Sequence, residues 1–248
     1  MNLRSQSDRM WGIMRKESDV NGKGDGLTGN EHYYDHGRPE MLEFVPARCV
    51  RVLDVGCGNG KFGRAIIDKY GAEVWGIEPN APAAEKAGMI LRSVLNESFD
   101  EEAQLPRGYF DCVVFNDVLE HMTDPWRALS FCRKIMRKNG IVVASIPNFR
   151  CWPNVLEVFY RGEWTYKDEG TLDRGHLRFY TYHSIRPFFL DAGYEVVSMR
   201  GINPVTGWKF RTFNAFFSHW TWDMRYMQFA VVARPSVHLG VPKQLSLQ

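Results

Sequence analysis

The stretch "LDVGCGNGKFG", residues 53–63, contains two overlapping glycine patterns. The pattern D-x-G-x-G-x-G begins at Asp54, and G-x-G-x-x-G, which is typical of dinucleotide-binding turns, begins at Gly58. Glycines allow a backbone to approach a ligand closely, so both patterns predict a ligand at a turn between a strand and a helix. The glycines by themselves do not identify that ligand.

Asp54 helps to choose among the ligands that use such a turn. It lies two residues before the first glycine, at the end of an apolar run, where its carboxylate would face the ligand. A pyrophosphate would be repelled by this charge, whereas the α-ammonium group of S-adenosylmethionine would be attracted. The carboxylate therefore argues against a dinucleotide.

Glu78 ends the next apolar run, in "VWGIEPN". A carboxylate at this place can accept hydrogen bonds from both hydroxyls of a ribose, which suits an adenosyl group and NAD equally well. A phosphate-binding P-loop is excluded because its sequence motif requires Ser or Thr after the lysine, and here Phe62 follows Lys61. Glu78 thus supports a nucleoside ligand without separating S-adenosylmethionine from NAD.

A sheet is needed to position these side chains, and the apolar pattern predicts one. Nearly continuous apolar runs alternate with amphipathic segments, which indicates a doubly wound α/β domain with a parallel sheet covered on both faces. The expected strands span 49–55, 73–79, 89–95, 109–117, 140–148, 194–202 and 227–235. The expected helices span 61–71, 81–88, 124–140, 152–160 and 182–192, with a short helix from Pro39.

The chain is expected to form one domain over residues 39–235. Residues 1–38 are polar and rich in glycine near their end, so we expect a flexible lead-in or lid, and 236–248 a tail. Within the domain, 150–181 and 203–226 break the alternation and are expected to be insertions on the acceptor side.

Four blocks give the chain a family resemblance: "VLDVGCGNGKFG", "VWGIEPN", "FDCVVFNDVLEHMTDP" and "GIVVASIPN". Their order and spacing resemble those of class I S-adenosylmethionine-dependent methyltransferases over residues 39–235. The resemblance implies a Rossmann-like, mostly parallel sheet of seven strands whose last strand is antiparallel.

The resemblance also implies which residues bind S-adenosylmethionine. The methionine moiety would contact Asp54, Gly56, Cys57, Gly58 and Gly60, the ribose Glu78, the adenine Pro79, and the sulfonium Asn116, Asp117 and Val118. Family members usually carry Gly-Asp after the third strand to meet the adenine amino group. This chain has Leu95-Asn96 instead, and Asn96 would accept that hydrogen bond, while Gly63 is left for helix packing.

Two histidines are candidates for the catalytic base. A neutral hydroxyl acceptor must lose its proton, and His121, after the fourth expected strand, and His176, in the first insertion, are the best placed. In the lead-in, "EHYYDHGRPE" offers further contacts that could close over the cofactor, namely His32, Tyr33, Tyr34, His36 and Arg38.

A more distant resemblance raises the question of a metal. "DVLEH" with the later "GHLRFYT" resembles ubiquinone-biosynthesis O-methyltransferases and small-RNA 2′-O-methyltransferases, some of which bind a divalent ion. On that template the ligands would be Asp117, Glu120, His121 and His176. A metal is not favoured, because Asp117 is shorter than the usual Glu and "EH" also occurs in relatives that need no metal.

The resemblance leaves the acceptor open. The segments "PNFRCWPNVLEVFYRGEW" and "GTLDRGHLRFYT" resemble bacterial methyltransferases of the glycan, lipopolysaccharide and secondary-metabolite type. They suggest O-methylation of a hydroxyl on a sugar or another small molecule. The alternatives are N-methylation of a small molecule and a non-catalytic methyltransferase fold that serves as a partner protein.

An aromatic stretch at 208–222 has three interpretations. Its aromatic residues recur at three- or four-residue steps, which predicts a helix with one apolar face. They are Phe210, Phe213, Phe216, Phe217 and Trp220. Such a face would cover the core, act as a lid over an apolar acceptor, or form a homodimer surface.

Composition excludes few partners. The 248 residues carry a formal net charge of +2, which does not favour binding to nucleic acid. No apolar run is long enough for a signal peptide or a membrane span, and the five cysteines are scattered, so we expect a soluble, cytoplasmic protein with reduced thiols.

Overall fold

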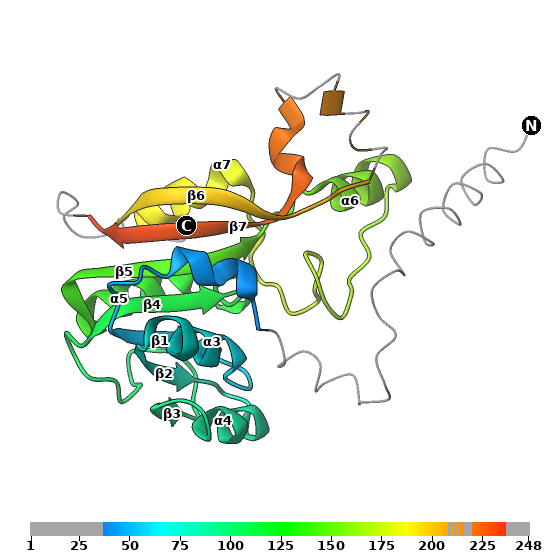
Figure 1. Cartoon of the computed structure of the whole chain (residues 1–248). Coiled ribbons are helices and arrows are strands. Elements are labelled where there is room, and N and C mark those ends of the chain that lie inside the picture. Colours follow the sequence, from blue (N-terminus) through cyan, green and yellow to red (C-terminus); the bar gives the residue numbers. More distant parts are fainter. Residues whose placement is uncertain (1–36, 208–209, 211, 213, 216–219, 237–248) are drawn as a thin grey trace, which may run out of the picture. The chain divides into compact units, whose positions relative to one another are not determined.

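Seven strands form a single sheet in the computed structural model, which describes residues 37–207, 210, 212, 214–215 and 220–236. The strand order is β3-β2-β1-β4-β5-β7-β6 (Figure 1). The strands are β1 (Arg51–Val55), β2 (Glu73–Ile77), β3 (Ser93–Leu95), β4 (Phe110–Asn116), β5 (Met136–Pro147), β6 (Tyr194–Pro204) and β7 (Tyr226–Pro235). β7 runs antiparallel to β5 and β6, and the other neighbours are parallel, which confirms the predicted sheet.

Helices follow most of the strands, and apart from α5 the predicted ones end near the expected residues. They are η1 (Pro39–Phe44), α3 (Lys61–Tyr70), α4 (Ala81–Gly88), η2 (Leu119–His121), α5 (Pro125–Ile135), α6 (Trp152–Val155), η3 (Leu156–Arg161), α7 (Tyr182–Asp191) and η4 (Trp222–Arg225). In Figure 1, α6 and the segment after it lie beyond the ends of β4 and β5. The parallel strands β1, β2, β4 and β5 also end on this side, so the loops that follow them meet there.

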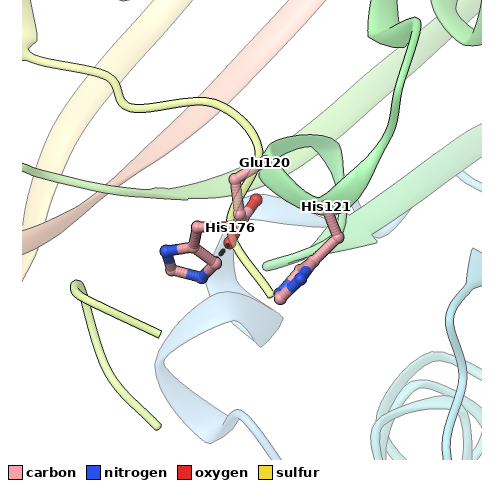
Figure 2. A group of neighbouring side chains, drawn as sticks. All are labelled: Glu120, His121 and His176. Atoms are coloured by element: carbon pink, nitrogen blue, oxygen red, sulfur yellow. Dashed lines mark ion pairs between the residues drawn. The ribbon is translucent and has the colours of Figure 1, made fainter. Parts of the chain in front are cut away.

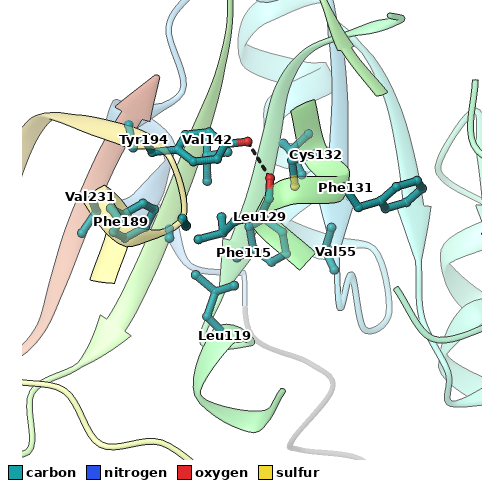
Figure 3. Close-up of a cluster of buried hydrophobic side chains, with 14 of the residues drawn as sticks. Val55, Phe115, Leu119, Leu129, Phe131, Cys132, Val142, Phe189, Tyr194 and Val231 are labelled. Carbon is teal, nitrogen blue, oxygen red and sulfur yellow. Dashed lines mark hydrogen bonds between the residues drawn. The ribbon is translucent and has the colours of Figure 1, made fainter. Parts of the chain in front are cut away.

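Each face of the sheet has its own core, because successive strand residues point to opposite faces. Leu53 of β1 packs in the cluster that contains residues of α5 and α7, whereas Val52 packs with residues of η1 and α3. In the first cluster the buried Tyr194 donates its hydroxyl hydrogen to the Leu129 carbonyl oxygen at 2.8 Å (Figure 3). The tyrosine therefore fills the core without leaving a polar group unpaired.

The predicted helix over 124–140 is wrong at its end. The helix ends at Ile135, and β5 begins at Met136, which pairs with Phe110 of β4. Gly140 is not a helix cap: a Cβ there would lie 2.8 Å from the Cβ of Met136 and 3.2 Å from the Phe110 carbonyl oxygen. A side chain at this position would press on Met136 and Arg137 of β5 itself and on Phe110 of β4, so glycine is needed for packing that the local pattern does not reveal.

Gly63, the last glycine of the G-x-G-x-x-G pattern, lies within α3 where it contacts β2 and the segment between α4 and β3. A Cβ there would lie 2.6 Å from Leu91 Cδ2 and 3.1 Å from Val74 Cγ1. The geometry confirms that this glycine serves helix packing. Gly88, at the end of α4, is the opposite case, since a Cβ there meets nothing within 4 Å.

We therefore expect opposite effects from two alanine substitutions. Gly63→Ala should lower the free energy of unfolding by about 1–2 kcal/mol, because overpacking outweighs the gain in helix propensity. Gly88→Ala should raise it by about 0.5 kcal/mol, since it restricts the unfolded chain at an open helical position. Urea unfolding followed by circular dichroism measures both, and equal effects of the two changes would contradict this packing.

Candidate active site

The glycine turn after β1 is packed between β2 and the turn after β4. The Gly56 N–H donates to the Ile77 carbonyl oxygen at 2.8 Å, and the Gly58 N–H donates to Glu78 Oε2 at 3.0 Å. Gly56 has a φ of 68°, and a Cβ there would lie 2.8 Å from Val118 Cγ2. Only glycine accommodates both the left-handed backbone and this contact. Gly60 also has a positive φ and precedes α3.

Two carboxyl groups are buried beside this turn. Asp54 is 1% exposed and its Oδ2 has no hydrogen-bond partner among the described residues. Glu78 is 4% exposed and accepts from the N–H groups of Gly58 and Asn80. Burial, together with the charge of Glu78, raises the pKa of Asp54 to about 7. A cation placed here would favour the ionised form of Asp54, which is what an α-ammonium group would do.

The other predicted cofactor residues lie around the same turn. Asn96 Nδ2 donates to the carbonyl oxygens of Glu78 at 2.8 Å and Pro79 at 3.1 Å, which holds its amide beside the end of β2. Cys57 is buried, and burial raises the pKa of its thiol, so it is neutral. Asn116, at the end of β4, has both amide atoms buried without a partner in the described part of the chain. Their contacts with the cofactor remain predictions.

Asp117 is held by side chains from distant parts of the chain. It has a φ of 54°, and its N–H donates to Ser145 Oγ at 3.0 Å, while Ser145 Oγ donates back to Oδ1 at 2.7 Å. Its Oδ2 accepts from Gln228 Nε2 at 2.7 Å and forms an ion pair with Arg38. Arg38, predicted as a contact from the lead-in, thus binds Asp117 directly.

Glu120, His121 and His176 form one cluster (Figure 2). One potential ligand atom from each lies within 4.8 Å of the others, and His176 Nε2 lies 3.8 Å from Glu120 Oε1. η2 supplies the first two residues, and the segment between η3 and α7 supplies the third. The Glu120 carbonyl oxygen accepts the N–H groups of Leu177 at 2.9 Å and Arg178 at 3.0 Å, which fastens that segment to η2.

Backbone carbonyls orient both imidazole rings. His121 Nδ1 lies 3.0 Å from the Gly175 carbonyl oxygen, and His176 Nδ1 lies 3.3 Å from that of Thr171. A carbonyl oxygen only accepts, so each Nδ1 carries the hydrogen and each neutral ring has its lone pair on Nε2. Burial, followed by the neighbouring His121, lowers the pKa of His176, which keeps it neutral near pH 7.

Glu120 is the member of this cluster whose fully buried carboxyl group has no hydrogen-bond partner among the described residues, at either oxygen. Burial, with the charge of Asp117, raises the pKa of Glu120 well above its usual range. The cluster can therefore accept a proton or hold a cation.

The structure brings three of the four template residues together. Asp117 is not part of the cluster, because its carboxylate is engaged by Arg38, Gln228 and Ser145. Glu120 joins the two predicted histidines, although only the distant resemblance had suggested it.

Sequence reasoning missed an aromatic face next to the cluster. Phe149 stacks on Trp164 with ring centroids 5.0 Å apart, and Phe179 lies 5.4 Å from Trp164 and 6.4 Å from His176. No local pattern predicts this face, because Phe149 follows β5 whereas Trp164 and Phe179 come from distant parts of the first insertion. The aromatics at 213, 216 and 217, like residues 32–36, lie outside the described residues. Phe210 is buried against Trp152, whereas Trp220 is 76% exposed.

A family model described as a methyltransferase domain matches residues 26–199. The chain belongs to this methyltransferase family. A ubiquinone biosynthesis O-methyltransferase of Rhodopseudomonas palustris is 36% identical over 112 residues, which is 42% of each chain. One from Cereibacter sphaeroides is 28% identical over 68% of this chain and 70% of its own length. The match thus spans about two fifths of the length of the first relative.

Solved structures support the same fold. An S-adenosylmethionine-dependent methyltransferase from Archaeoglobus fulgidus superposes with a TM-score of 0.59 at 20% identity, over 78% of this chain and 90% of its own. A Burkholderia thailandensis N-methyltransferase with bound S-adenosylhomocysteine has a TM-score of 0.55 at 16% identity, over 84% and 82%. These structures show the class I methyltransferase fold, and the family model identifies the chain as a methyltransferase domain, whose family uses S-adenosylmethionine as its cofactor. None of its described helices has the length and apolarity needed to cross a membrane.

The raised pKa of Asp54 predicts a pH-dependent cofactor affinity. The ammonium group of S-adenosylhomocysteine needs an ionised Asp54, and with a pKa of about 7 this carboxyl is mostly protonated at pH 6 and mostly ionised at pH 8. Binding measured by calorimetry should be about tenfold weaker at pH 6 than at pH 8.

Asp54→Asn should bind weakly and with little change over this pH range. Asp68→Asn, which alters an exposed carboxylate on α3, is the matched control and should behave like the wild type. Tight, pH-independent binding by Asp54→Asn would remove Asp54 from the cofactor site.

Proposed function

We propose that this protein transfers the methyl group of S-adenosylmethionine to a hydroxyl oxygen of a small molecule. The observation that carries this proposal is the Glu120–His121–His176 cluster, which begins three residues after Asp117 at the end of β4. The sulfonium makes the methyl group electrophilic, so the protein must align the acceptor and remove its proton. The relatives named as O-methyltransferases support oxygen as the acceptor atom.

The two Nε2 lone pairs supply the base. When one imidazole takes the hydroxyl proton, its positive charge forms beside the buried carboxyl of Glu120, which lies 3.8 Å from His176 Nε2. The imidazolium favours the ionised form of Glu120, whose raised pKa otherwise keeps it protonated, and the ionised carboxylate in turn stabilises the imidazolium. The carbonyls of Gly175 and Thr171 keep each Nε2 pointed away from the backbone.

The aromatic face formed by Phe149, Trp164 and Phe179 suggests an acceptor with a flat apolar surface. Such a surface is offered by a phenolic ring and by one face of a sugar ring. Trp164 is 43% exposed and Phe179 37%, so both retain surface for an acceptor. Phe179 places this face beside the ring of His176.

The cluster also fits a divalent metal ion. Histidines that bind metals commonly donate their second ring N–H to a carbonyl or carboxylate, as both rings do here, and Glu120 adds a buried carboxyl without a partner. Glu120, His121 and His176 would hold the ion without Asp117. A bound divalent ion would lower the pKa of the acceptor hydroxyl.

Substitutions in the cluster should separate catalysis from cofactor binding. His121→Ala and His176→Ala should each lower the turnover of a hydroxyl acceptor at least 100-fold while S-adenosylhomocysteine binds within about threefold of the wild type. His183→Ala, an exposed histidine of α7, is the control. Turnover is followed by mass spectrometry with 3,4-dihydroxybenzoate, glucose or a cell extract as the acceptor. Near-normal turnover of a hydroxyl acceptor in both cluster variants would contradict the role of the histidines as bases, and near-normal formation of an N-methylated product from the extract would favour N-methylation instead.

The acceptor screen also tests catalysis itself. Formation of S-adenosylhomocysteine that depends on the acceptor supports an enzyme. Tight cofactor binding without product from any acceptor would point to a non-catalytic partner protein.

Chelation distinguishes the two ways of activating the hydroxyl. If the cluster holds a metal, dialysis against EDTA should abolish turnover, and Mg²⁺ or Zn²⁺ should restore it only while Glu120 and both histidines are present. If the histidines act as bases on their own, turnover should survive chelation. Binding of Co²⁺ or Zn²⁺ to the protein can be measured without an acceptor, and a metal site predicts that Glu120→Gln loses this binding.

A further inference from the structure

Three residues other than glycine have a left-handed backbone in the described part of the chain. Arg38 has a φ of 44°, Asp117 of 54° and Asn203 of 51°. Such a backbone is unfavourable for a residue with a side chain unless its surroundings hold it, and strained residues of this kind concentrate at functional sites. These three lie before η1, after β4 and near the end of β6, yet one set of contacts joins them.

Five side chains close a ring of polar contacts, which we call the Arg38 ring. Arg38 pairs with Asp117 Oδ2, and Gln228 Nε2 donates to the same oxygen at 2.7 Å. Asn203 Nδ2 donates to Gln228 Oε1 at 2.6 Å and reaches Glu40 Oε1 at 3.4 Å. Glu40 Oε1 also forms an ion pair with Arg38 Nε at 2.9 Å, which closes the ring. All three strained residues therefore belong to this ring.

The Arg38 ring holds the turn that the two halves of the site share. Asp117 is followed by Val118, which packs against Gly56 of the cofactor turn. The same turn continues into Glu120 and His121 of the acceptor cluster. A shift of Asp117 would thus move the cofactor wall and the acceptor cluster together.

The composition of the ring argues against packing as its sole purpose. A left-handed turn needed only for folding is most easily made by glycine, and apolar neighbours would avoid the cost of partly burying charges. The side chain of Arg38 is 15% exposed and that of Asp117 24%. Partly buried charge pairs of this kind confer a defined orientation more readily than stability.

We propose that Arg38, Glu40, Asn203 and Gln228 are positioning residues, which act through Asp117 to align the cofactor turn with the Glu120–His121–His176 cluster. This inference rests on the proposed methyl transfer, because it assigns an alignment to the two pockets of that reaction. Ser145 supports the same turn by bonding both the N–H and the Oδ1 of Asp117. The remote residues do not contact the reacting atoms.

The test uses the full-length protein and the affinity for S-adenosylhomocysteine, measured by calorimetry. Arg38→Met removes the guanidinium donors from the ring and should weaken binding at least tenfold. Asn203→Gly removes a link of the ring but accepts a φ of 51° without strain, so its melting temperature should stay within about 3 °C of the wild type. Its binding should still weaken at least threefold.

A double-mutant cycle distinguishes alignment through the ring from separate structural roles. Because both residues act through the same contacts, Arg38→Met and Asn203→Gly together should weaken binding by clearly less than the product of their single effects. With the acceptor found above, the turnover number at saturating S-adenosylmethionine should also fall in both variants. Arg234→Met, which breaks an exposed pair with Glu195 toward the opposite end of β7, is the matched control and should change neither quantity.

Each outcome bears on one hypothesis. If the wild type does not bind S-adenosylhomocysteine, the proposed function fails. If the wild type binds it and Asn203→Gly retains both affinity and turnover, the positioning role is overturned, even where Arg38→Met does not fold. Effects of the two substitutions that multiply independently would also overturn it.

Discussion

The contact between Arg38 and Asp117 is the interaction on which the arrangement of the site depends. Asp117 begins the turn after β4, and this turn provides both Val118, which packs against the glycine turn, and two members of the Glu120–His121–His176 cluster. Its backbone is left-handed, so it needs side-chain partners to stay in place. Those partners are Arg38 before η1, Ser145 of β5 and Gln228 of β7, and Asn203 of β6 in turn binds Gln228.

Acidic groups dominate the end of the sheet where the site lies. Asp54, Glu78 and Glu120 are all at most 4% exposed, and the pKa values of Asp54 and Glu120 are raised by burial. Buried carboxyl groups without enough partners favour the arrival of positive charge. S-adenosylmethionine carries an ammonium group and a sulfonium. Its two positive charges therefore suit a site whose buried carboxyl groups have few partners within the protein.

The cofactor half and the acceptor half differ in how readily they could be predicted. Asp54, the glycines and Glu78 lie at the ends of two adjacent parallel strands, so apolar periodicity and one contiguous motif place them together. The histidines were predicted one by one, but their carbonyl partners and the inclusion of Glu120 depend on how 162–181 folds back onto η2. The end of α5 was mispredicted for a similar reason, since Gly140 serves a contact with β4.

The sequence by itself determined the alternation of strands and helices, the glycine turn and the two carboxylates at its side, because these depend on local periodicity and on neighbouring strand ends, and the family resemblance added the antiparallel last strand. Only the tertiary structure decided that Asp117 binds Arg38 instead of joining the histidines, and that Asn203 and Gln228 complete the Arg38 ring. The physical reason is the separation along the chain between the residues that interact. A strand or a glycine turn is specified by residues adjacent in the chain, whereas the partner of a buried charge is whichever group the folded sheet brings within hydrogen-bond distance.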